Sequence, residues 1–203
     1  FNLTQGSPIG GSYSGTGITA SPLFDPSTAG SGTHTITYSY TDGNGCSNSA
    51  TQTITVNPLP VVTFAVLADV CVDAADFALS GGSPLGGTYS GTGVSTGNFS
   101  PATAGAGTHT ITYSYTDGNG CSNSTTQTIT VNPLPVVTFA ALSDVCLDAA
   151  DFALSGGSPL GGTYSGTGVS GGNFSPPAPG SGTPTITYSY TDGNGCSNST
   201  TQT

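Results

Sequence analysis

A string of fifteen residues, TITYSYTDGNGCSNS, occurs three times without change, at residues 35–49, 110–124 and 185–199, with a period of 75 residues. A second block, FALSGGSPLGGTYSGTGV, stands at 77–94 and again at 152–169, and a diverged copy occupies residues 1–18. A third block, NPLPVVTFA, is found at 57–65 and 132–140. Self-similarity at a fixed period is the mark of an array of like folding units, so we expect tandem repeats rather than one large domain.

The repeat sets the expected domain boundaries. One complete unit runs from 58 to 132, a partial unit that lacks its N-terminal part covers 1–57, and 133–203 forms a unit that lacks the end of its last strand. We call these the first, middle and third repeats in chain order. Because neither end of the sequence coincides with a unit boundary, we expect the chain to be a window onto a longer array.

Alternation of apolar and polar residues within a repeat predicts β-strands. Ile111, Tyr113 and Tyr115 share one face of a strand, and the alternation resumes over 126–131, after the sequence Asp-Gly-Asn-Gly. Those four residues accept the positive φ angles of a tight turn and predict a hairpin. Shorter strands are expected at 136–140, 151–155 and 163–165. About seven short antiparallel strands in a unit of this length predict a small β-sandwich.

Composition narrows the possible functions. The chain has no Lys or Arg, ten acidic residues and a net charge of −10, so it cannot contact phosphate groups through cations, and we expect no nucleic-acid partner and no docking to anionic membranes. No run of about 18 apolar residues is present, which predicts no membrane insertion. With 32 Gly and 14 Pro, helices are disfavoured and strands and turns remain.

The five cysteines fall into two classes by position in the repeat. Cys71 and Cys146 stand early in a unit, whereas Cys46, Cys121 and Cys196 follow the Asp-Gly-Asn-Gly turn. If each unit pairs its own two cysteines, the disulfides are Cys71 with Cys121 and Cys146 with Cys196, and Cys46 has its partner upstream of Phe1. Pairing between adjacent repeats, such as Cys46 with Cys71, also fits the spacing. Either arrangement requires an oxidising, extracellular compartment.

Candidate chemistry is sparse, and we expect no catalytic site and no bound cofactor, so that the chain is not an enzyme. The two histidines, His34 and His109, are replaced by Pro184 in the third repeat, which a catalytic base would not tolerate. No unit contains the four clustered Cys or His ligands that structural zinc prefers. Calcium is the one metal with candidate ligands, because it binds several oxygens close together. The candidates are two Asp triplets: Asp69, Asp73 and Asp76, and Asp144, Asp148 and Asp151.

The order of motifs resembles a known repeat type. A Cys precedes FALSGG, and GGTYSGTGV, NFSPATAG, GTHTITYSYTDGNGCSN and TQTITVNPLP follow. This order resembles the PKD-like and immunoglobulin-like repeats of giant Bacteroidota surface proteins. The resemblance implies an all-β fold of tandem immunoglobulin-like (PKD-like) β-sandwich repeats of about 75 residues each. It also implies export by the type IX secretion system and kinship with gliding-type adhesins.

Two functional hypotheses follow. The first is a structural repeat region of an extracellular adhesin stalk or cell-surface filament, in which like units serve as spacers and chains self-associate. The second is a multivalent carbohydrate- or calcium-binding module of a secreted surface protein, with a glycan or other surface ligand. Near-identity of the repeats favours the first, since a spacer needs only a repeated shape, and an exposed aromatic platform on each unit would favour the second.

Overall fold

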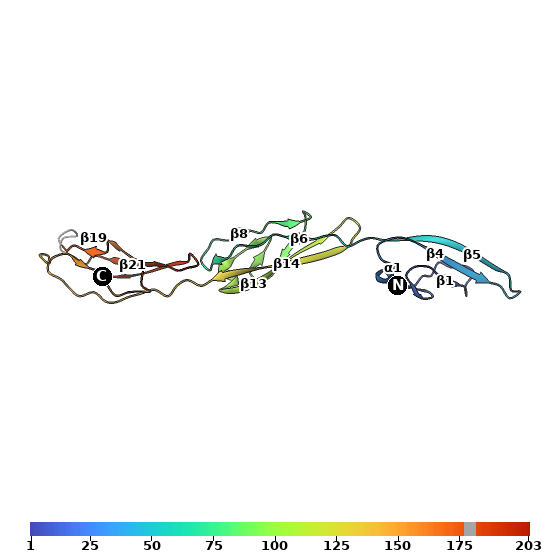
Figure 1. Cartoon of the computed structure of the whole chain (residues 1–203), viewed down its shortest axis with the longest axis horizontal. Helices are drawn as coiled ribbons and strands as arrows, with labels where there is room; N and C mark the ends of the chain where they lie inside the picture. The colour runs from blue at the N-terminus through green and yellow to red at the C-terminus, as the bar shows by residue number, and fades with distance from the viewer. Residues whose placement is uncertain (177–181) are drawn as a thin grey trace. The chain divides into compact units, whose positions relative to one another are not determined.

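The computed structural model describes residues 1–176 and 182–203 and shows an all-β protein, as the sequence predicts (Figure 1). Only two helices occur in these ranges, α1 (Pro26–Ala29) and α2 (Pro101–Ala104), each of four residues. None of the described helices is long and apolar enough to cross a membrane. Short strands joined by Gly and Pro turns make up the rest of the regular structure.

The chain forms two compact units. The first contains Phe1–Thr63 together with Ser83–Gly87 and Ser114–Ser124, and the second contains Phe64–Gly82, Thr88–Tyr113 and Thr125–Thr203. The domain boundaries expected at residues 58 and 133 come from the repeated sequence. They stay a prediction.

The first repeat is built around one long hairpin in the first unit. Its strands are β1 (Ser12–Ser14), β2 (Ile18–Ala20), β3 (Leu23–Phe24), β4 (Gly32–Thr41) and β5 (Ser47–Val56). The sheet order is β1-β4-β5, and the hairpin register runs from Gly32 opposite Val56 to Thr41 opposite Ser47. The Asp-Gly-Asn-Gly turn therefore closes a hairpin, as predicted.

Helix α1 of this repeat begins at a capping carboxylate. Asp25 accepts hydrogen bonds from the hydroxyls of Ser27 and Thr28 and from the Ser27 amide. These bonds favour the ionised carboxylate and lower the pKa of Asp25 below its usual value. The middle repeat has Ser100 at the same position, without a side-chain cap.

The middle repeat has the same order of elements with a fuller set of strands. They are β6 (Thr63–Phe64), β7 (Val70–Cys71), β8 (Phe77–Ala78), β9 (Gly82–Ser83), β10 (Thr88–Ser90), β11 (Val94–Ser95), β12 (Asn98–Phe99), β13 (Gly107–Thr116) and β14 (Ser122–Asn132). One sheet has the order β10-β13-β14-β7, a second has β11-β12-β8, and β6 pairs with β9. Strand β7 is parallel to the end of β14, with Val70 opposite Val131 and Cys71 opposite Asn132.

The third repeat lies wholly in the second unit. Its strands are β15 (Thr138–Phe139), β16 (Phe152–Ala153), β17 (Gly157–Ser158), β18 (Thr163–Gly166), β19 (Val169–Ser170), β20 (Asn173–Phe174), β21 (Ile186–Thr191) and β22 (Ser197–Gln202). The predicted strands at 136–140, 151–155 and 163–165 correspond to β15, β16 and β18.

Side chains from several of these sheets share one core. Phe139 of β15, Phe174 of β20, and Ile186 and Tyr188 of β21 are buried together with Leu154. Because β15, β20 and β21 belong to different sheets, the core lies between sheets, as in a β-sandwich. The same alternation buries Ile111 and Tyr113 of β13, as the sequence predicts.

Candidate functional site

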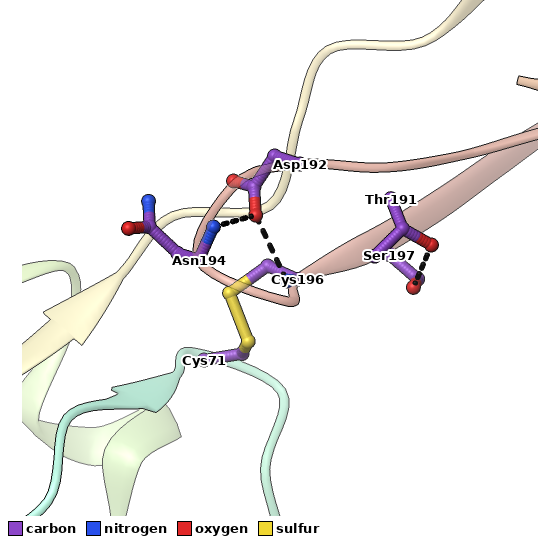
Figure 2. Close-up of a disulfide and its surroundings, with 6 residues drawn as sticks. All are labelled: Cys71, Thr191, Asp192, Asn194, Cys196 and Ser197. Carbon is purple, nitrogen blue, oxygen red and sulfur yellow. Dashed lines mark hydrogen bonds between the residues drawn. A yellow bond between two sulfur atoms is a disulfide. The ribbon is translucent and has the colours of Figure 1, made fainter. Parts of the chain in front are cut away.

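The turn that carries a cysteine has the same geometry in all three repeats. In the third repeat, Asp192 Oδ1 accepts the backbone N–H groups of Asn194 and Cys196, each at 2.9 Å (Figure 2). The turn closes through a bond of 3.1 Å from the Gly195 amide to the Asp192 carbonyl, and Gly195 has φ +82°, which favours glycine. Asp42 and Asp117 hold the other two turns in the same way. The Asp and Gly of this motif are therefore explained by backbone geometry.

The third-repeat turn is joined covalently to the middle repeat. Cys196 forms a disulfide with Cys71 across 125 residues, with a Cα–Cα distance of 5.6 Å (Figure 2). Cys71 lies on β7, beside the last residues of β14, so the bond fastens the hairpin turn of one repeat to the segment where the preceding repeat ends. Cys196 is almost completely buried, at 1% exposure.

This bond corrects the predicted pairing of Cys71 with Cys121 and of Cys146 with Cys196. Cys196 directly precedes β22, whereas Asp144, Val145 and Leu147 line a cavity together with Thr203, just beyond the other end of β22. A strand of six residues is roughly 20 Å long, and a disulfide requires Cα atoms within about 7 Å of each other. A repeat therefore holds its two cysteines at opposite ends of a hairpin strand, and the disulfide joins two adjacent repeats. The pairing named above for adjacent repeats, Cys46 with Cys71, does not form, because Cys71 is bonded to Cys196 and Cys46 is unpaired.

Three cysteines are unpaired in the structure. Cys46 and Cys146 are exposed and Cys121 is half-buried. Cys46 and Cys121 stand in turns identical to that of Cys196, so the turn alone does not decide whether a disulfide forms. Cys196 differs from the other two because Cys71, from the middle repeat, lies beside it.

A second repeated site is a loop held by two tyrosines, which we call the tip loop (residues 6–11, 82–87 and 157–162). In the third repeat the Tyr164 hydroxyl accepts the Gly157 amide at 2.8 Å, and the Tyr188 hydroxyl accepts the Gly162 amide at 2.9 Å and donates to the Pro159 carbonyl. In the first repeat, Tyr13 and Tyr38 make the same bonds to Gly6, Gly11 and Pro8.

Glycine is required where the tip loop meets a tyrosine ring. A Cβ on Gly82 would lie 2.6 Å from the ring of Tyr113, closer than any real contact. Tyr113 is buried as expected, at 2% exposure, whereas Tyr115, expected on the same face, is only half-buried. Tyr188 of the third repeat is also 2% exposed, and its hydroxyl holds the loop of that repeat. The loop in turn presents one aliphatic side chain per repeat to solvent, at 90% or more exposure: Ile9, Leu85 and Leu160.

The structure does not gather the candidate calcium ligands. All six aspartates are exposed, and among residues 1–176 and 182–203 no group of three or more His, Cys, Asp or Glu side chains could hold a metal ion. Asp69 Oδ1 instead accepts the Thr130 amide at 2.9 Å and secures β7 to β14. Of the six aspartates, Asp69 is thus explained by a bond between strands.

Each of the two histidines makes a hydrogen bond to the backbone. Nε2 of His34 lies 2.9 Å from the Gly30 carbonyl, and His109 makes the same contact with Gly105. Since a carbonyl only accepts, Nε2 carries the proton, and each ring supports the chain just after a short helix. Pro184, which replaces them in the third repeat, lines the cavity near Thr203.

Sequence reasoning missed the partner of Cys71 and the tyrosine-held loop. The recurring Gly-Gly and Tyr of GGTYSGTG were a signal for the loop, because glycine beside an aromatic ring often marks a close contact. No comparable signal exists for the disulfide, because its two cysteines are as far apart in sequence as the length of more than one repeat.

Comparison with known proteins shows little similarity. No family model matches the chain, and no curated protein matches it. Among solved structures, the chain is similar to one described as a Ca²⁺-stabilized adhesin that helps an Antarctic bacterium reach out and bind ice. The sequence identity is 14% and the TM-score is 0.39, over 84% of this chain and 55% of that one. The chain thus spans about half the length of the protein it matches.

Proposed function

We propose that the chain is a non-catalytic structural repeat region of an extracellular bacterial adhesin stalk or cell-surface filament. The observation that carries this proposal is the Cys71–Cys196 disulfide, which links two successive repeats rather than bracing one. A bond inside a repeat stabilises that repeat alone, whereas a bond between repeats also transmits tension from one to the next. PKD-like or immunoglobulin-like repeats of type IX secreted surface proteins have the form that such a stalk needs.

Disulfide formation supports the extracellular location. Structural disulfides persist in oxidising compartments and are rare in the cytosol. The bond closes a loop of 125 residues, for which chain-entropy arguments give a stabilisation of roughly 5 kcal/mol. The chain has no Lys or Arg and hence only histidine and its N-terminus to pair with its carboxylates, so covalent linkage is an economical way to stabilise small cores.

Stretching single molecules from both termini tests whether the disulfide carries tension between the two repeats. With the disulfide intact, the residues between Cys71 and Cys196 cannot extend, which shortens the fully stretched chain by roughly 440 Å at about 3.5 Å per residue. Reduction, or Cys71→Ser, should restore that length. Cys46→Ser is the matched control, because Cys46 is exposed and unpaired. Equal lengths for the oxidised chain and for Cys71→Ser would contradict the proposal.

Electron microscopy of the native material tests the larger assembly. A stalk or filament should appear as long fibres with regular subunit spacing on cells and after release from them, with reduced samples showing weakened or broken fibres. Compact particles that carry another domain would contradict the stalk and would place the function in that domain.

A second function, multivalent binding of a glycan or other surface ligand, is favoured by one observation. The tip loop of each repeat exposes one aliphatic side chain to solvent, and these are Ile9, Leu85 and Leu160. Several weak contacts on one chain add to a high avidity when all of them reach the same surface. Replacing Ile9, Leu85 and Leu160 by Ser should then abolish adhesion to a glycan-coated surface without lowering the melting temperature. Adhesion that survives the triple substitution would count against this function.

A further inference from the structure

Each hairpin turn contains an exposed asparagine followed by an exposed glycine. The pairs are Asn44-Gly45, Asn119-Gly120 and Asn194-Gly195. Figure 2 shows the carboxamide of Asn194 directed away from Asp192 and Cys196. In the part of the chain that the structure describes, only the backbone N–H of each of these asparagines is bound, and their carboxamides have no hydrogen-bond partner. The three side chains are therefore free to turn toward the glycine that follows.

The glycine of each pair leaves room for that approach. A Cβ on Gly45, Gly120 or Gly195 would meet no atom within 4 Å outside the adjoining residues. Each glycine nitrogen carries one hydrogen bond, of 3.1 Å, to the carbonyl of the aspartate that begins the turn. Because glycine has no side chain, its backbone nitrogen is less hindered than that of any other residue.

A second asparagine, four residues later in the repeat, is held in place instead. Asn123 Nδ2 donates to the Pro60 carbonyl at 2.9 Å, and Asn123 Oδ1 accepts the Ser124 amide at 2.9 Å. Asn198 makes the same two bonds in the third repeat, at 3.0 Å and 2.8 Å. Both ends of each carboxamide are thus engaged, and neither side chain can turn without breaking two hydrogen bonds.

We infer that Asn44, Asn119 and Asn194 are sites of covalent modification, at which the asparagine becomes isoaspartate or aspartate. The backbone nitrogen of the following glycine loses its proton, attacks Cγ of the asparagine and closes a succinimide ring. The bond from Cγ to Nδ2 breaks, and Nδ2 leaves as ammonia together with that proton. Water then opens the ring. Cleavage between the ring nitrogen and Cγ gives aspartate, and cleavage between the ring nitrogen and the main-chain carbonyl carbon gives isoaspartate.

Isoaspartate alters the turn that carries the cysteine. Asp192 Oδ1 accepts the N–H groups of Asn194 and Cys196, each at 2.9 Å, so the modified residue lies between the two donors to one oxygen. Isoaspartate continues the backbone through its Cβ and Cγ, which lengthens the chain between those donors. The new carboxylate also repels that of Asp192. We expect faster hydrogen exchange at the Cys196 amide after modification, and the inference does not depend on the proposed function.

Mass spectrometry of the aged chain provides the test. The oxidised 203-residue chain is incubated at mildly alkaline pH, reduced, and cleaved before aspartate. The products include residues 42–68, 117–143 and 192–203, which differ in length and each contain one Asn-Gly and one Asn-Ser pair. We expect each product to gain the mass of an amide that has become an acid at its Asn-Gly pair, with fragmentation that identifies isoaspartate.

An unstructured peptide separates the effect of the fold from that of the local sequence. The synthetic peptide of residues 116–126 contains both Asn119 and Asn123 without their tertiary contacts. In the folded chain, Asn123 must break two hydrogen bonds before it reacts, whereas the Asn119 pair must break one. The rate of conversion at Asn119 divided by that at Asn123 should therefore be about fivefold higher in the chain than in the peptide.

A matched pair of variants assigns the mass gain to its residue. Asn119→Gln should abolish the gain in residues 117–143, because the longer side chain closes a ring with the next nitrogen much more slowly. Asn123→Gln should leave that gain unchanged. Asn119 and Asn123 are both exposed, and an unchanged melting temperature verifies that each variant is folded.

Three outcomes would overturn the inference. One is an unmodified Asn-Gly pair in the folded chain after the peptide has converted fully, which would show that the turn protects the pair. Another is a rate ratio no higher in the chain than in the peptide, because the fold would then have no part in selecting the site. The third is a mass gain that persists in Asn119→Gln.

Discussion

Two segments of nearly identical sequence adopt different structures in this chain. Asp-Val-Cys-Val-Asp at 69–73 contains strand β7, whereas Asp-Val-Cys-Leu-Asp at 144–148 contains no strand. Cys71 is bonded to Cys196, and Cys146 is exposed and unpaired. Both segments keep the same turn, in which the amide three residues after the cysteine donates to its carbonyl, at 3.0 Å in one and 3.1 Å in the other.

The difference lies in what stands beside each segment. Val70 and Cys71 pair with Val131 and Asn132, and the Val72 amide donates to the Asn132 carbonyl at 2.9 Å. Among residues 1–176 and 182–203 no strand pairs with the Cys146 segment, and its residues Asp144, Val145 and Leu147 line a cavity of about 380 Å³. Val145 and Leu147 are consequently about half exposed. Local sequence determines the turn, and the neighbouring strand edge determines whether a strand and a disulfide form.

The largest effect is expected from the disulfide. Cys71→Ser should lower the free energy of unfolding by up to roughly 5 kcal/mol, because the constraint on a long loop is lost. Denaturant unfolding measures the change, and Cys146→Ser is the control that should leave stability unchanged. Cleavage at aspartate verifies the pairing, because an Asp lies between each successive pair of cysteines. Equal loss of stability in the two variants would show that the segments do not differ as described.

Removing the strand partner should make the Cys71 segment resemble the Cys146 segment. Val131 is 1% exposed, and Val131→Ala should cost about 2 kcal/mol through lost burial and an imperfectly filled core. Hydrogen exchange of the Val72 amide should then rise toward that of Leu147. Val136→Ala, at a side chain that is 83% exposed, should change neither quantity. Unaltered exchange at Val72 would show that β7 does not depend on the end of β14.

A smaller effect is expected at the carboxylate that secures β7. Asp69→Ala removes the acceptor of the Thr130 amide and should lower the free energy of unfolding by about 1 kcal/mol, because the group is exposed to solvent. Asp144→Ala should have no effect on stability. A loss of similar size in Asp144→Ala would mean that the two carboxylates have equivalent partners.

The smallest effect is expected from calcium. Since no three acidic side chains group together in the described residues, neither Asp triplet should respond to the ion. The melting temperature should be the same with millimolar Ca²⁺ and with a chelator, as measured by circular dichroism. A rise with Ca²⁺ that Asp73→Ala or Asp148→Ala abolishes would restore the triplets as a calcium site.

Much of the fold could be predicted from local patterns. The alternation of Ile111 and Tyr113 marked a buried strand face, and Asp-Gly-Asn-Gly marked a hairpin turn, because both depend on residues within a few positions. The role of Asp69 could not be predicted, because its partner Thr130 is 61 residues away. The predicted disulfide pairing was wrong for the same reason. Cysteine spacing gives the length of the loop that a disulfide closes, but it does not show which strand ends lie close together.

The sequence by itself determined the repeat, the all-β class, the turns and the positions of the buried tyrosines, since these follow from short-range geometry and the pattern of apolar residues. Only the tertiary structure decided that Cys71 joins Cys196, that Asp69 holds a strand, and that tyrosine hydroxyls hold the tip loop. Identical local sequences cannot encode different states by themselves. The strand edge that packs against each copy supplies the remaining hydrogen bonds and apolar contacts, and these decide which state is stable.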